Sequence, residues 1–288
     1  MEVKALACEL PYNHGLPLSR FSIHEIRQEV LARGIVAQIS ETTLWRWLDS
    51  DAIRPWQYRS WIYPRDPGFL EKASRVLDLY EGRWGGKPLG PSDYVLSADE
   101  KTSIQARIRK HPTLGPRSQE PMKVEHEYKR GGALNYMAAW DVHQAKIFGC
   151  VEPRSGIESF GHLVAYVMNQ EPYRTASRVF WIVDNGSSHR GQPAITRLQE
   201  RWPNAVMIHL PVHASWLNQI EIYFSVVQRK VLTPNDFASL VEVEDRLLKF
   251  QKHYEEIAKP FEWKFTRKNL LNLMDKLSDQ RILKEKAA

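Results

Sequence analysis

Cysteine is scarce and long apolar runs are missing. The chain has 288 residues but only two cysteines, Cys8 and Cys150, with no CxxC spacing. We infer a reducing compartment and exclude a structural zinc site built on cysteines. No run of eighteen apolar residues exists, which excludes a transmembrane helix, and residues 1–10 lack the apolar centre of a signal peptide. These absences predict a soluble, cytoplasmic protein with no membrane partner.

Motifs for nucleotide cofactors are missing as well. Neither GxxxxGK[S/T] nor GxGxxG occurs, so nothing indicates a bound nucleotide cofactor. What the sequence does have is a 43% hydrophobic content, enough for a sizeable core, and a formal net charge of +6. A positive balance favours a polyanionic partner, but many ordinary proteins are equally basic. The partner therefore has to be inferred from motifs.

Residues 1–60 are predicted to form a small, separate all-α domain. Ser22 and Glu25 form an S-x-x-E capping box before a helix over residues 23–33, and Ser40 caps a second helix over 41–49. Two short helices with a tight connection fit a helix-turn-helix, whose second helix enters the major groove of DNA. A plain helical hairpin is the alternative.

Within the second of these helices, the pattern separates an inner from an outer face. Leu44, Trp47 and Leu48 are expected to face inward, and Thr43 and Arg46 outward. If the helix-turn-helix interpretation holds, Thr43 and Arg46 face the DNA groove.

Residues 54–68 combine three prolines with interleaved arginine and aromatic side chains. The prolines oppose a helix. Such a composition suits an extended arm along a DNA backbone, with Arg54, Arg59 and Arg65 on phosphates. A linker whose aromatic residues pack on the next domain is the alternative. Residues 61–90 are predicted to form this linker and a helix over 69–81.

Residues 91–232 alternate strand and helix, which predicts an α/β domain. The expected order is three strands, then helix, strand, helix, strand, helix, and it implies a mixed sheet with helices on both faces. The strands are expected to end at Asp99 and Asp184 and to cover 132–140, 146–151 and 205–210; the helices cover 156–169, 195–201 and 216–230. Residues 233–288 are predicted to form a helical tail.

Three acidic residues stand out in this domain. Asp99 and Asp184 each follow a short apolar run that is typical of a buried strand, and Glu221 lies beside the apolar stripe of a helix. An unpaired buried carboxylate costs several kcal/mol. Three of them could share Mg²⁺, which prefers oxygen ligands, in a two-metal site for phosphodiester chemistry. Taken singly, Asp184 could merely cap the next helix and Glu221 could be solvated; the pattern does not choose between Asp99 and Glu100.

The acids lie within three ordered sequence blocks, which are residues 99–106, residues 184–189 and residues 215–221. These blocks resemble the signatures of DDE transposases, in particular the bacterial insertion-sequence branch of the mariner superfamily. Residues 128–142 and 259–263 resemble that branch too. The spacing agrees, since 36 residues separate Asp184 from Glu221 (221 − 184 = 37).

The resemblance implies a ribonuclease-H-like (integrase-type) catalytic domain with a mixed five-stranded sheet. It selects Asp99 over Glu100 as the first catalytic acid and metal ligand, with Asp184 and Glu221. It also implies supporting roles for Asn185, His189 and Asn218. Two Mg²⁺ ions, replaceable by Mn²⁺, double-stranded DNA as substrate, a TA target, a homodimer and association with the nucleoid are further expectations.

The chain departs from the family pattern at its beginning. Family members usually carry two helix-turn-helix units, whereas this sequence has room for one. Met1 falls in the segment that would join the two units. A truncated or split reading frame is therefore expected. Two rival functions stay open: a repurposed transposase that only binds DNA, and a simple metal-dependent nuclease.

Overall fold

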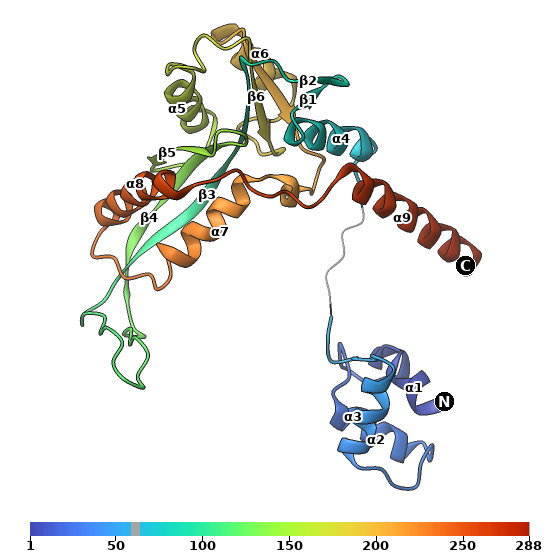
Figure 1. The fold of residues 1–288 in the computed structure, drawn as a ribbon. Helices are drawn as coiled ribbons and strands as arrows, with labels where there is room; N and C mark the ends of the chain where they lie inside the picture. Colours follow the sequence, from blue (N-terminus) through green and yellow to red (C-terminus); the bar gives the residue numbers. More distant parts are fainter. Residues whose placement is uncertain (59–63, 288) are drawn as a thin grey trace. The chain divides into compact units, whose positions relative to one another are not determined.

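The computed structural model describes residues 1–58 and 64–287, with the backbone alone for 279–287. It divides into two units, Met1–Tyr63 and Pro64–Ala288, which we describe separately. Figure 1 shows the helices and strands of each unit along the chain. No helix within these residues combines the length and the apolar character needed to cross a membrane.

The first unit consists of helices α1 (Glu2–Ala7), α2 (Ile23–Ala32) and α3 (Glu41–Ser50), with a short 3₁₀ turn at Pro11–His14. The predicted capping box begins α2: the Glu25 amide donates to Ser22 Oγ at 3.3 Å, and the Ser22 amide donates to the Glu25 carboxylate at 2.6 Å. The helices enclose a small core. Its fully buried members are Phe21, Ile26, Val30, Leu44 and Leu48.

Two details of this unit differ from expectation. Residues 33–40 connect α2 to α3, which is longer than the three- or four-residue turn of a helix-turn-helix. Trp47 was predicted to face inward but is 45% exposed. Leu44 and Leu48, one turn apart, already fill the inner face of a short helix, so position 47 lies outside this narrow stripe.

The second unit is built on a five-stranded mixed sheet. In sheet order the strands are β5 (Lys146–Glu152), β4 (Lys129–Asp141), β3 (Asp93–Ile108), β6 (Arg178–Val183) and β7 (Ala205–His209). β3, β4 and β5 pair antiparallel, whereas β6 pairs parallel to both β3 and β7. This confirms the predicted sheet. A two-stranded hairpin, β1 (Arg83–Trp84) and β2 (Lys87–Pro88), precedes it.

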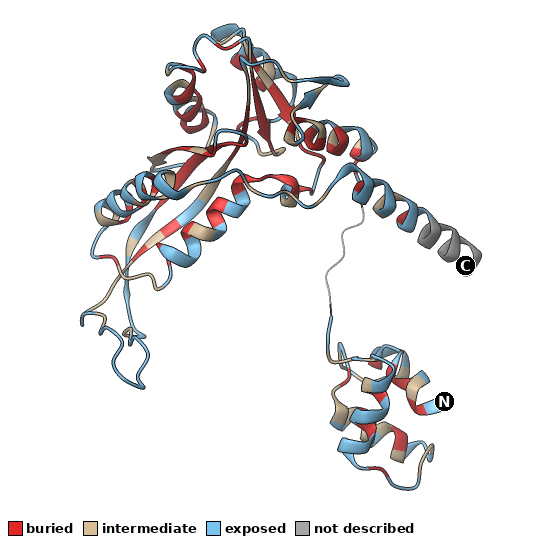
Figure 2. Ribbon diagram, viewed as in Figure 1, coloured by how far each residue is buried: buried red, intermediate tan, exposed pale blue. Residues whose placement is uncertain are grey.

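Helices cover both faces of this sheet (Figure 1). One face carries α4 (Phe69–Tyr80), α7 (Ile220–Lys230) and α8 (Leu240–Ile257), and the other carries α5 (Ile157–Met168) and α6 (Gly191–Arg201). The last helix, α9 (Arg267–Ala287), contacts α4. Figure 2 shows the buried residues concentrated in the strands and in the sheet-facing sides of the helices.

The core reaches beyond the predicted limits of 91–232. Helix α4 contributes Phe69, Val76 and Leu77 to the core under the sheet, and α8 contributes Val243 and Leu247. Residues predicted to be linker and tail are therefore part of the second unit, because the sheet face that α7 leaves open needs apolar cover.

Two element boundaries also differ from expectation. Strand β3 does not end at Asp99 but continues nine residues further, to Ile108, because β4 still pairs with it. The helix predicted from residue 216 is divided: Ser215–Leu217 forms a 3₁₀ turn, Asn218 is extended, and α7 begins at Ile220. Both differences lie beside the acids and position them.

Candidate active site

Strand register brings Asp99 and Asp184 together. The parallel pairing of β3 with β6 ends at the pair Ser97 and Ile182. Asp99 lies two residues further along β3, and Asp184 follows directly after the last residue of β6, Val183. Because side chains alternate along strands, both aspartates lie on the sheet face that α7 covers. Glu100 is placed on the opposite face by the same alternation, and the choice of Asp99 as the catalytic acid stays a prediction.

Asn218 fixes the start of α7 to β3. Its side chain is 1% exposed, and its Nδ2 donates to the Ala98 carbonyl at 3.1 Å and to Asp99 Oδ2 at 3.3 Å. Its Oδ1 accepts a hydrogen bond from the Ser97 hydroxyl, which in turn accepts from the Ile220 amide at 2.9 Å. The extended backbone at Asn218 is therefore what allows the first turn of α7, with Glu221, to begin beside Asp99.

Tyr80 of α4 supports the same break in the helix from the other side. Its hydroxyl donates to the Leu217 carbonyl at 2.7 Å and accepts from the Gln219 amide at 3.3 Å. The Leu217 carbonyl and the Gln219 amide, on either side of Asn218, are thus both hydrogen-bonded at the break.

His189 holds Asp184. The imidazole is fully buried, its Nε2 contacts Asp184 Oδ1, and its Nδ1 lies 3.0 Å from the Ser188 hydroxyl. The Gly186 amide donates to the same Oδ1 at 2.7 Å. The hydrogen bond from His189 is the main reason that the pKa of Asp184 lies below its usual range. The neighbouring Asn185 ties this loop to the end of β7, donating to the Leu210 carbonyl at 2.7 Å.

The other acids are shifted in the opposite direction. Burial, followed by the charge of Asp184, raises the pKa of Asp99 to about 7. Burial also raises the pKa of Glu221; the charge of Lys101 opposes this rise and that of Asp184 adds to it. The charge of Asp184 thus acts on both Asp99 and Glu221, and the charge of Glu221 acts on Asp99, as expected for carboxylates that lie near one another.

The carboxylates keep oxygens available for a ligand. In the described part of the chain, no hydrogen bond reaches Asp184 Oδ2 or either carboxylate oxygen of Glu221. In that same part, no group of three or more histidine, cysteine, aspartate or glutamate side chains is arranged so that it could hold a metal ion. An all-oxygen donor set with clustered negative charge fits Mg²⁺ or Mn²⁺. Asp99, Asp184 and Glu221 therefore stay the predicted ligands of such an ion.

Sequence reasoning missed several groups near the site. The backbone amide of Glu100 donates to Asp99 Oδ1 at 2.8 Å. Burial raises the pKa of the Glu100 carboxylate, and its Oε2 has no hydrogen-bond partner among the described residues. Ser97 and Tyr80 were missed because their partners lie more than a hundred residues away in the chain. Only Glu100 gave a signal, as the acid next to Asp99.

Three of the predicted DNA-binding residues, Thr43, Arg46 and Arg54, lie in the first unit. Thr43 and Arg46 are exposed on α3, although the Thr43 hydroxyl is hydrogen-bonded to Ser40 Oγ at 2.9 Å. Arg54 is exposed and pairs with Asp49 at 3.2 Å. Arg65 is exposed in the second unit, and Arg59 lies outside the described residues. Their role in binding DNA stays a prediction.

Comparison with known proteins identifies the family. The model of the DDE superfamily endonuclease family matches residues 94–244, which include all three acids and more than half of the chain. The chain belongs to this family. The prediction that it is a DDE enzyme is therefore confirmed. No curated protein matches the sequence.

Several solved structures are similar to this chain, and the first of them agrees with this assignment at the level of the fold. The crystal structure of the Mos1 mariner paired end complex with Mn has 15% sequence identity and a TM-score of 0.50, covering 92% of this chain and 79% of that one. The Mos1 strand transfer complex has 15% identity and a TM-score of 0.49, covering 92% and 78%. The Mos1 complex with Mg has 14% identity and a TM-score of 0.47, covering 92% and 79%.

Proposed function

We propose that this DDE endonuclease is a DNA transposase that cleaves DNA at the ends of a mobile element and transfers the strand into target DNA. The observation that supports it most is the approach of Asp99 in β3, Asp184 directly after β6 and Glu221 in α7, since the charge of Asp184 acts on both other acids. The family match and the fold of the Mos1 complexes, whose names specify paired ends and strand transfer, support it further.

Two divalent ions, held by these three carboxylates, would supply charge stabilisation and activation of the attacking oxygen. The residues themselves supply position. Asn218 orients Asp99 toward the start of α7, and His189 with the Gly186 amide leaves Asp184 Oδ2 open. Such preorganisation accounts for much of the rate in phosphoryl transfer, since there is little covalent chemistry for the protein to perform.

The direct test replaces each acid by its amide. Asp99→Asn, Asp184→Asn and Glu221→Gln keep side-chain size and remove a ligand charge, so each is expected to abolish cleavage of labelled DNA while leaving DNA binding nearly unchanged. Asp245→Asn and Glu244→Gln, both exposed on α8, are the matched controls. Cleavage within tenfold of wild type in any of the three would remove that residue from the catalytic set.

The same assay separates the rival functions. Nicked products without joined products would indicate a simple nuclease, and binding without either product would indicate a DNA-binding protein only. Mn²⁺ is expected to replace Mg²⁺. Ca²⁺ is expected to support binding with little cleavage, because it prefers a looser coordination of higher number.

The target and the assembly are also part of the proposal. A TA target and a homodimer that holds both element ends follow from the family resemblance. Helices α2 and α3 would cover few base pairs, and each base pair that is read contributes about 1–3 kcal/mol of specificity. We therefore expect less than a thousandfold preference for end DNA over random DNA, measured by competition binding; a larger preference would contradict this expectation.

A further inference from the structure

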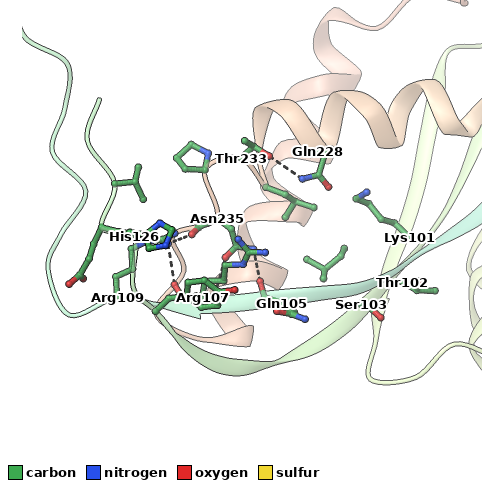
Figure 3. A pocket seen from close by; sticks show the side chains of 16 residues that line it. Lys101, Thr102, Ser103, Gln105, Arg107, Arg109, His126, Gln228, Thr233 and Asn235 are labelled. Carbon is green, nitrogen blue, oxygen red and sulfur yellow. Dashed lines mark hydrogen bonds between the residues drawn. The ribbon is translucent and has the colours of Figure 1, made fainter. Parts of the chain in front are cut away.

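A cavity of about 760 Å³ lies along the outer half of β3, beyond the catalytic acids. Strand β3, the segment that joins β3 to β4, and the end of α7 with residues 232–235 line it. Figure 3 shows Lys101 at one end, Arg107, Arg109 and His126 at the other, and Gln228 of α7 across from the strand. We call this cavity the β3 groove.

The groove begins at the catalytic site. Lys101 lies two residues after Asp99 on the same strand, and its charge acts on Glu221. From Lys101 to Arg107 the strand spans about 20 Å, at about 3.3 Å per residue. A bulge interrupts its pairing with β4 between Lys101 and Ile104, where Ser103 takes a left-handed φ of 57°. Bulges of this kind redirect a strand beside an active site.

The walls of the groove are fixed by hydrogen bonds between distant segments. The Arg107 amide donates to Asn235 Oδ1 at 3.0 Å, and Asn235 Nδ2 donates to the Gln105 carbonyl at 2.6 Å. Arg109, whose side chain is 7% exposed, donates to the carbonyls of Glu125 (2.7 Å) and Asn235. The cavity is thus preformed and does not depend on a ligand to order it.

The chemistry of the lining is that of a nucleic-acid strand site. Tyr128 is 40% exposed, and the guanidinium of Arg107 lies 4.7 Å from its ring centroid, that of Arg109 5.9 Å. An exposed aromatic ring backed by arginine is a platform on which an unpaired base can stack. The only lining carboxylate in the described part of the chain, Glu125, already accepts hydrogen bonds from residues 110 and 111.

We propose that the β3 groove binds unpaired nucleotides of the DNA strand next to the scissile phosphate, with Lys101 on the backbone and a base stacked on Tyr128. This inference rests on the proposed function, because it takes DNA as the substrate. It adds a strand site within the catalytic unit, distinct from the duplex contacts predicted for α3. Duplex DNA offers no free base face, so the groove distinguishes unpaired from paired DNA.

The test compares the full-length protein's affinity for a blunt duplex with that for the same duplex carrying a 5′ or a 3′ single-stranded extension. Anisotropy is measured in Ca²⁺, which limits cleavage. Wild type is expected to bind one extended DNA more tightly than the blunt one. Tyr128→Leu is expected to reduce this gain in affinity by about tenfold, which is the effect of losing one stacked base. Tyr128→Phe is expected to keep the gain. Lys101→Gln is expected to weaken binding of the extended DNA, and to weaken it less at high salt than at low salt.

Tyr166→Leu, an exposed tyrosine on α5, and Lys249→Gln, an exposed lysine on α8, are the matched controls and should leave the gain unchanged. Equal binding of blunt and extended DNA by wild type would overturn the proposal, as would a full gain in Tyr128→Leu. Mg²⁺-dependent cleavage of the blunt duplex is measured separately. If it persists while the gain is absent, the groove proposal alone fails; if it is absent while the gain depends on Tyr128, the transposase proposal alone fails.

Discussion

Gly186 is the position where the smallest change should disturb the catalytic site most. A Cβ atom there would lie 2.9 Å from Asp184 Oδ1, 3.0 Å from His189 Nε2 and 3.3 Å from His189 Cε1. Gly186→Ala therefore has to displace the Asp184–His189 pair. Restoring ordinary contact distances of about 3.4–4.0 Å requires a shift of roughly 0.5–1 Å in one or both groups.

We expect this shift to reduce kcat for DNA cleavage by about ten- to a hundredfold, because a misplacement of about 1 Å in a catalytic group can cost a hundredfold. The Mg²⁺ concentration needed for half-maximal rate should rise as well, since Asp184 Oδ2 moves with the carboxylate. Overpacking typically costs about 1–3 kcal/mol, so the protein should still fold. Single-turnover cleavage at several Mg²⁺ concentrations, together with thermal unfolding, measures all three quantities.

Gly161→Ala is the control for this experiment. Gly161 lies inside α5, and a Cβ atom there would meet nothing within 4 Å, so the substitution should leave cleavage unchanged and slightly favour the helix. Cleavage by Gly186→Ala at the wild-type rate and Mg²⁺ dependence would refute the role assigned to the Asp184–His189 pair. If Gly186→Ala fails to fold, the loop around Gly186 is required for the stability of the protein before it is required for catalysis.

Two further predictions concern stability and DNA binding. Hydrogen bonding from Arg178 lowers the pKa of Asp93, whose side chain is 3% exposed. The pair should therefore stabilise the fold above the unfolded pKa of about 3.9 and lose this effect as pH falls through the lower folded value. Asp93→Asn should cost about 1 kcal/mol at pH 7 and less at pH 3, by urea unfolding; an equal cost at both pH values would contradict this. Arg46→Ala should weaken specific DNA binding by about 1–3 kcal/mol, by anisotropy, and an equal loss on random DNA would indicate a phosphate contact.

Local signals in the sequence were sufficient for most elements. Ser22 with Glu25 and Ser40 mark helix beginnings through hydrogen bonds to amides only three residues away, and the structure has both caps. The strands before and after residues 141–145 and the strand before Asp184 were likewise predicted from their own residues. The mixed five-stranded sheet and the DDE family followed from the order of elements and from the three sequence blocks together.

What the sequence could not give depends on partners far away in the chain. Asp99 lies within β3 because β4 continues to pair beyond it, and no residue near Asp99 signals that. The break at Asn218 exists because Ser97 and Tyr80, each more than a hundred residues distant, hydrogen-bond the groups around it. Periodicity alone favoured one uninterrupted helix. The sequence by itself determined which acids could act, whereas only the tertiary contacts decided how they meet and that a preformed groove leads away from them.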